Sequence, residues 1–148
     1  MSAVVTAARG WIGTPYRHQA ACKGAGCDCL GLVLGVWRER FGALPETVPR
    51  YSKDWCEPQG DELLWRKARQ WLVAKAPEDE APGDVLLFRM RAGSVAKHLG
   101  IAGRVGARAS FIHAYSGHAV AESPLGAPWR RRIVARFQFP KEASAWQR

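Results

Sequence analysis

The hydrophobic pattern of this 148-residue chain changes its period near the middle. Apolar side chains recur at helical spacing in residues 2–10, 29–41 and 61–74, and a Pro- and Gly-containing segment at 77–83 ends this part. Beyond it, apolar and polar residues alternate in five strand-like stretches, at residues 84–91, 97–104, 109–116, 118–122 and 129–139. Helices followed by consecutive strands predict an α+β fold, with N-terminal helices packed on an antiparallel β-sheet.

Length and composition predict one domain, 1–148, with a core of its own. Hydrophobic residues make up 47% of the chain and no low-complexity tract is present, which excludes a disordered chain. No apolar run approaches the roughly 20 residues that a membrane span needs. Residues 1–13 lack the basic-then-apolar layout of a signal peptide, so we expect synthesis in the cytoplasm and no membrane span.

The chain is strongly basic, with 22 Lys and Arg against 13 Asp and Glu and a net charge of +9. Such a charge attracts polyanions, either nucleic acid or an anionic cell-wall polymer. The basic cluster at residues 130–132 fits an exposed strand or loop as well as it fits a binding role. A recognition-helix motif, a zinc knuckle and a clustered aromatic platform are all missing from the sequence, so we expect no direct nucleic-acid recognition.

Four cysteines are present: Cys22, Cys27, Cys29 and Cys56. Their even number is compatible with disulfides, but cytosolic thiols stay reduced and no signal peptide precedes them. A zinc site would combine His18 with the first three cysteines. None of those spacings is the Cys-x₂-Cys knuckle of structural zinc sites, so we expect neither a metal nor another cofactor.

Cys29 occupies the first position of the predicted helix 29–41, directly after Asp28, a preferred N-cap residue. The positive end of the helix dipole favours a thiolate there, and the thiolate is the form that attacks a carbonyl carbon. We therefore expect Cys29 to be a nucleophile. Cys27 lies in the preceding loop, and we expect it to be a small packing residue.

Two histidines lie on the strands that flank the turn at residues 103–108. If the turn centres between Val105 and Gly106, His98 stands opposite His113 on the same face of the sheet, close enough to hydrogen-bond. Cys29, His98 and His113 would then form a nucleophile, a general base and a residue that orients the base. The backbone N–H of Cys29 would donate to the developing oxyanion.

The sequence resembles the NlpC family of bacterial cell-wall cysteine peptidases over roughly residues 3–139. The likeness is carried by four segments and one histidine. Residues 13–16 (Gly-Thr-Pro-Tyr) resemble the opening turn of the family, and residues 28–33 (Asp-Cys-Leu-Gly-Leu-Val) resemble its nucleophile motif. Residues 82–88 resemble its Pro-Gly-Asp strand entry, and residues 97–101 (Lys-His-Leu-Gly-Ile) resemble the strand that carries the base. His113 falls where the family places its third polar residue.

The resemblance implies a papain-like α+β domain that hydrolyses the stem peptides of peptidoglycan, often between D-glutamate and the diamino acid. It implies catalytic roles for Cys29, His98 and His113 and a place for the Tyr16 hydroxyl near the nucleophile or the substrate. Asp28 would meet a substrate amine, although its role as helix N-cap explains it equally well.

The closest likeness is to the phage branch of the family, including tail-associated peptidases of gene-transfer-agent particles, on residues 26–33 and 129–132. It implies tail proteins as partners and a location on the particle tail, where the enzyme opens the cell wall for DNA delivery. The alternative is a non-catalytic tail module that only binds the wall. Two departures, Leu30 in place of a serine and residues 18–20 in place of a Gly-Gly pair, leave the scissile bond open.

Overall fold

The computed structural model describes residues 2–44, 51 and 61–141. Cys56 lies outside these residues. The helices are α1 (Ala3–Arg9), α2 (Cys29–Phe41), α3 (Leu63–Trp71), α4 (Ala127–Arg130) and the 3₁₀ helix η2 (Gly106–Arg108). The strands are β1 (Ala21–Cys22), β2 (Gly26–Cys27), β3 (Val73–Lys75), β4 (Val85–Phe88), β5 (His98–Ala102), β6 (Ser110–Tyr115), β7 (His118–Pro124) and β8 (Ile133–Gln138).

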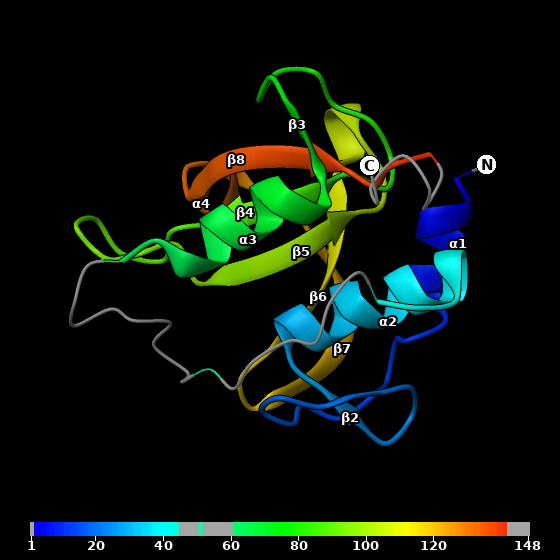
Figure 1. The fold of residues 1–148 in the computed structure, drawn as a ribbon. Coiled ribbons are helices and arrows are strands. Elements are labelled where there is room, and N and C mark those ends of the chain that lie inside the picture. Colours follow the sequence, from blue (N-terminus) through cyan, green and yellow to red (C-terminus); the bar gives the residue numbers. More distant parts are fainter. Residues whose placement is uncertain (1, 45–50, 52–60, 142–148) are drawn as a thin grey trace.

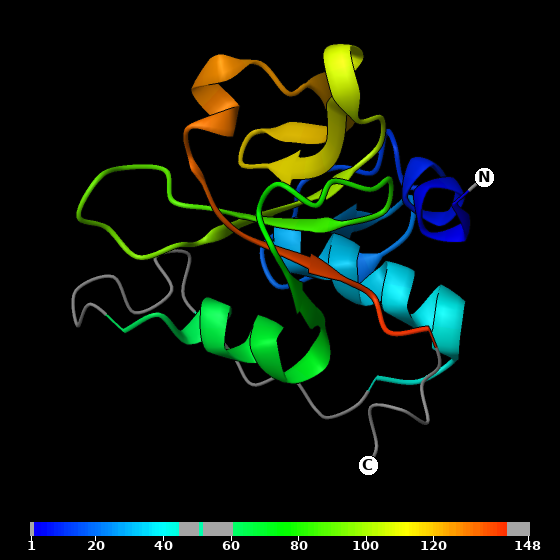
Figure 2. The same cartoon turned by 90° about the horizontal axis from the view of Figure 1, so that it is seen from above.

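Six strands form one antiparallel sheet in the order β3-β8-β4-β5-β6-β7, which confirms the predicted fold class. The helices α1, α2 and α3 lie on one side of this sheet, and α4 and η2 lie on the other (Figures 1 and 2). No helix among the described residues is both long enough and apolar enough to cross a bilayer.

The two faces of the sheet bury different side chains because successive residues of a strand point to opposite faces. Leu87, Leu99 and Ile101 pack with the apolar side of α2 in the larger core cluster. Phe88 and Phe111 face the other way and pack with half-buried Trp129 in a smaller cluster. This alternation decides on which face each histidine of the sheet lies.

Helix α2 approaches its neighbours closely because two of its residues are glycines. A Cβ at Gly31 would lie 1.8 Å from the carbonyl oxygen of Ala20, and a Cβ at Gly35 would lie 2.0 Å from the indole of Trp11. The loop before the helix and the residues after α1 therefore fix the position of the α2 N-terminus.

The Pro-Gly-Asp segment holds three parts of the sheet together through a buried carboxylate. Asp84 accepts hydrogen bonds from Lys75 Nζ of β3 (2.9 and 3.0 Å) and from a guanidinium nitrogen of Arg136 of β8 (2.9 Å). It also accepts from the backbone N–H of Ala81 at 2.9 Å. The side chains of all three charged residues are nearly inaccessible, so this cluster is structural.

Three predicted element boundaries are wrong. The helix expected at 61–74 ends at Trp71, since Val73–Lys75 forms β3 against β8. The loop expected before the helix at 29–41, which carries Cys27, contains the two-stranded ribbon β1-β2. The strand expected from 129 begins only at Ile133, because Pro128 opens the short helix α4, a position that its fixed φ suits.

Candidate active site

The Cys29 sulfur lies where β5 and β6 separate. These strands pair through Ile101–Ile112 and Ala102–Phe111, and the ladder stops there among the described residues. At the start of β5, Cys29 Sγ donates to the carbonyl oxygen of Lys97, the residue before the strand, at 3.8 Å and lies near the N–H of Leu99.

Burial determines the protonation of this thiol. Cys29 is 9% exposed, and desolvation together with the neighbouring Asp28 charge raises its pKa to about 12. The N–H groups of Leu99, Leu30 and Cys29 itself act in the opposite direction, as expected for the start of a helix. The predicted thiolate is therefore wrong for this structure, because desolvation exceeds the helix-end effect.

The two histidines are paired, but in a register different from the predicted one. The pair Ile101–Ile112 shifts the alignment by two residues, so His98 and His113 are diagonal neighbours instead of opposite residues. The helix η2 moves the centre of the turn, and an even shift keeps both side chains on one face. His98 Nε2 and His113 Nδ1 are 2.9 Å apart and share a hydrogen bond.

The hydrogen-bonded chain continues to Ser123 on β7, whose Oγ is 3.1 Å from His113 Nε2. Aromatic rings surround the histidines, and the Trp129 centroid is 5.8 Å from that of His98 and 5.3 Å from that of His113. Burial, followed by the neighbouring His113, lowers the pKa of His98 to about 3. Burial, followed by His118, lowers the pKa of His113 to about 4, so both rings are neutral at pH 7.

The structure brings the two histidines together but does not join them to the thiol. His98 is paired with Phe88 on β4 and shares its face, away from α2, whereas Cys29 belongs to the core on the α2 side. Within the described residues, no hydrogen bond connects Cys29 Sγ to either imidazole. The sulfur lies instead against the backbone on both sides of His98.

Asp28 caps α2, which confirms one of its two predicted roles. Its Oδ1 accepts the N–H of Gly31 at 2.7 Å. Its Oδ2 accepts the N–H of Gln19 at 2.7 Å and the hydroxyl of Tyr51 at 2.5 Å, and His18 Nδ1 is 3.7 Å away. A substrate amine could reach this carboxylate only in exchange for one of these donors.

Tyr16 lies beside the nucleophile motif. Burial raises the pKa of its hydroxyl to about 12, and the neighbouring Cys29, Asp28 and Cys27 add to this effect. Its backbone forms a parallel bridge with Cys27, which is fully buried, as predicted for a packing residue. The structure thus groups Tyr16, Asp28 and Cys29 on one side of β5 and the histidine pair on the other.

Two features of the site were not found in the sequence. Ser123 and Trp129 contact His113 from β7 and α4, and a sequence without strand registers gives no signal for either contact. Gln19, which stands where the family has a glycine pair, has φ 63°, the left-handed conformation that favours glycine. Its N–H bond to Asp28 compensates for part of this strain.

No group of three or more His, Cys, Asp or Glu side chains converges as a metal site within the described residues. His18, Cys22, Cys27 and Cys29 therefore do not form the zinc cluster considered above. The three cysteines in the described part of the chain are free thiols, of which Cys22 is exposed.

Similarity searches relate the chain to hydrolases and to solved domains of one family. It is 29% identical to the gamma-DL-glutamyl hydrolase of Bacillus subtilis (strain 168), over 94% of this chain and 30% of that protein. The chain thus spans under a third of this curated relative.

Solved structures show the same fold. A domain of the peptidoglycan hydrolase SagA superposes with a TM-score of 0.58 at 21% identity, covering 93% of this chain and 97% of that one. A protein from Bacillus cereus ATCC 10987 superposes with a TM-score of 0.61 at 19% identity, covering 92% and 39%. The fold is therefore the papain-like α+β fold that the sequence predicted.

The family model matches residues 13–137, which include the capped helix, the thiol and both histidines. The chain belongs to the NlpC/P60 family.

Proposed function

We propose that this domain is a cysteine peptidase that hydrolyses stem peptides of peptidoglycan. The observation that carries the proposal is the placement of Cys29: its sulfur lies against the backbone groups of Lys97 and Leu99, which flank a histidine that is hydrogen-bonded to a second one. A purely structural cysteine would need neither histidine.

The hydrogen-bonded chain can leave His98 free to act as a base. If His98 Nε2–H donates to His113 Nδ1, and His113 Nε2–H donates to Ser123 Oγ, then His98 Nδ1 carries the free lone pair. If His113 Nδ1–H donated to His98 Nε2 instead, His98 Nδ1 would carry the ring proton and could not accept a proton from the thiol. We assign the first arrangement, in which His113 orients the ring and fixes its tautomer.

The reaction then begins from a neutral thiol and a neutral imidazole. The reaction requires the sulfur to turn from its place beside Lys97 toward His98, and the hydrogen bond that this movement breaks is long, at 3.8 Å. Sulfur attacks the peptide carbonyl as its proton passes to His98, which later donates the proton to the leaving amine; water then hydrolyses the thioester. The N–H groups of Cys29 and Leu30 at the helix start are the donors for the oxyanion.

Two residues beside the thiol are proposed to bind substrate. The Tyr16 hydroxyl remains protonated at all physiological pH values and can donate to a peptide carbonyl near the sulfur. The Asp28 carboxylate would accept a substrate amine in place of the Tyr51 hydroxyl. The similarity to a gamma-DL-glutamyl hydrolase supports the bond between D-glutamate and the diamino acid as the scissile bond.

The decisive experiment compares muropeptides released from purified peptidoglycan by the wild type, Cys29→Ala and Cys22→Ala, using mass spectrometry. We expect the wild type and Cys22→Ala, which changes an exposed thiol, to release the same new peptides. Cys29→Ala should release none while keeping its circular dichroism spectrum. Full release by Cys29→Ala would overturn the proposal, and binding of peptidoglycan without turnover by the wild type would favour the wall-binding alternative.

We also propose that the domain works on the tail of a phage or gene-transfer-agent particle. The proposal is supported by the resemblance of residues 26–33 and 129–132 and by the net charge of +9, which favours an anionic wall. Mass spectrometry of purified particles tests it: the protein should be enriched in the tail fraction.

A further inference from the structure

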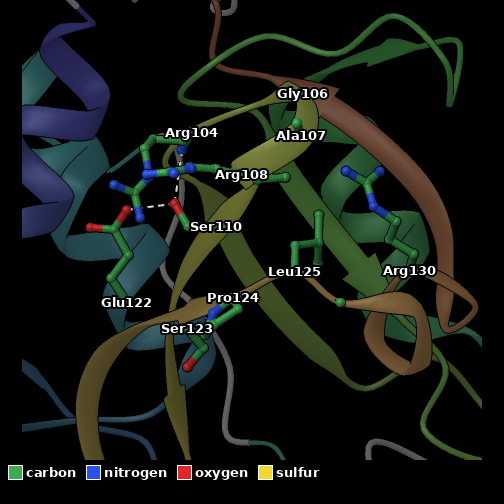
Figure 3. A pocket seen from close by; sticks show the side chains of 12 residues that line it. Arg104, Gly106, Ala107, Arg108, Ser110, Glu122, Ser123, Pro124, Leu125 and Arg130 are labelled. Carbon is green, nitrogen blue, oxygen red and sulfur yellow. Dashed lines mark hydrogen bonds between the residues drawn. The ribbon is translucent and has the colours of Figure 1, made fainter.

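A cavity of about 670 Å³ lies between η2 and α4, both of which contribute residues to its lining. Figure 2 shows these two helices on the face of the sheet opposite α2. The volume of the cavity falls within the range of small-molecule sites. Leu125 and Pro124 form an apolar part of its wall, and Ser110, Glu122 and Ser123 line another part (Figure 3). The cavity lies outside the group formed by Tyr16, Asp28 and Cys29.

Three arginines from separate segments line this cavity. Arg104 follows β5, Arg108 belongs to η2 and Arg130 to α4. Figure 3 shows Arg104 and Arg108 at the end of the cavity near Ser110, and Arg130 at the opposite end, beyond Leu125. Guanidinium groups on both sides of a cavity can hold one anion or two neighbouring anionic groups through paired N–H donors.

The acidic residues nearby leave an excess of positive charge. Glu122 is bound by the guanidinium of Arg9 through two contacts of 2.9 and 3.1 Å, and it accepts from Ser110 Oγ at 2.6 Å. These bonds, with Arg104 nearby, hold the pKa of Glu122 below its usual value. The carboxylate is thus ionised but already neutralised by Arg9.

The arginines of the cavity differ in their availability. Arg130 donates to Glu80 at 3.0 Å, a carboxylate that Arg136 also contacts. In the described part of the chain, the Arg108 guanidinium makes neither a hydrogen bond nor an ion pair, and its side chain is exposed. Arg108 is therefore the donor most available to a ligand.

We propose that this cavity binds an anionic group, a carboxylate or a phosphate, of a cell-wall polymer. Arg108 and Arg104 would hold the anion, while Leu125 and Pro124 would pack against its carbon skeleton. The choice of the wall as the source of the anion rests on the proposed function, whereas the anion site rests on the cavity and its arginines. Ser123 lines the cavity and also bonds His113, so the bound polymer lies on the same face of the sheet as the histidine pair.

The first test measures binding of N-acetylglutamate and glycerol 3-phosphate by NMR titration in Arg108→Ala and in Arg38→Ala. Arg38 is an exposed arginine near the end of α2, across the sheet from the cavity, and its replacement removes the same charge. We expect Arg108→Ala to raise the Kd about tenfold and Arg38→Ala less than twofold, because Arg108, unlike Arg38, donates directly to the anion. Arg108→Lys should recover part of the affinity, since it keeps the charge but loses the paired donors.

Equal increases in Kd for the two alanine variants would overturn the proposed site, because binding would then depend only on the net charge of the protein. The same holds if neither small anion shifts the resonances of residues that line the cavity.

The second test identifies the source of the anion on isolated cell walls, in a Cys29→Ala background that leaves the wall intact. If hydrofluoric acid, which removes phosphodiester-linked polymers, abolishes the difference between Arg108→Ala and Arg38→Ala, the ligand is a phosphate. If the difference persists, the ligand is a carboxylate of the peptidoglycan. If the protein with Cys29 intact binds walls through Arg108 but releases no peptide, the proposed peptidase activity is refuted and the anion site stands.

Discussion

Acidification from pH 7.5 to pH 5 should destabilise this domain through the two histidines of the sheet. His98 and His113 have native pKa values of about 3 and 4, against an ordinary value of 6.5 in the unfolded chain. Below pH 6.5 the unfolded chain therefore binds protons that the native domain does not bind. The stabilisation from keeping the histidines neutral is complete above pH 6.5 and is lost as the pH falls toward the native pKa values.

The size of the effect follows from proton linkage. Each pH unit below the unfolded pKa lowers the free energy of unfolding by about 1.4 kcal/mol for each histidine that stays neutral in the native state. At pH 5, about 1.5 units below that pKa, the loss is roughly 2 kcal/mol per histidine and roughly 4 kcal/mol for both. This is a large part of the 5–15 kcal/mol that typically stabilises a domain of this kind.

Urea unfolding followed by tryptophan fluorescence at several pH values measures this loss. We expect His113→Gln to reduce the pH-dependent loss to about half, whatever the stability of the variant at pH 7.5, and the double variant with His98→Gln to remove most of it. A wild-type loss below about 1 kcal/mol, or an unchanged loss in the double variant, would refute the assignment of two buried neutral histidines.

Two further substitutions test the fold around the site. Asp84→Asn should lower the free energy of unfolding by about 3–5 kcal/mol, because it leaves Lys75 and Arg136 buried without their counter-charge. Asp61 forms an exposed pair with Arg66, so the control Asp61→Asn should change the free energy of unfolding by less than about 1 kcal/mol. Urea unfolding at pH 7.5 measures both, and similar losses would contradict the structural role of Asp84. Gly31→Ala should cost about 3 kcal/mol or more, despite the better helix propensity of alanine, because the new Cβ would lie 1.8 Å from a backbone oxygen. A thermal melt unchanged from wild type would contradict that close contact.

The fold class could be predicted because local patterns decide it. The change from helical to alternating periodicity places α2 and the central strands, and Asp28 and Gly42 mark the ends of α2. The short strand β3 could not be predicted because its pairing with β8 depends on a partner about 60 residues away. Tertiary pairing here overrides the helical periodicity of residues 61–74.

The candidate site was predictable in its residue types and only partly in its geometry. His98 and His113 were expected on one face, and they lie on one face although the register was off by two residues, because an even shift leaves the facing of both side chains unchanged. The protonation of Cys29 was not predictable, since the N-terminal position in a helix is visible in the sequence and the depth of burial is not. Burial opposed the helix dipole and exceeded it.

These two results together change the expected resting state of the site. At pH 7 the Cys29 thiol is far below its pKa and the His98 imidazole far above its own, so neither carries a charge. A thiolate–imidazolium pair would require charges in a site that desolvates both groups, which is unfavourable without a compensating partner. The proton transfer therefore belongs to turnover, when a bound peptide carbonyl and the helix-end N–H groups receive the negative charge as it develops.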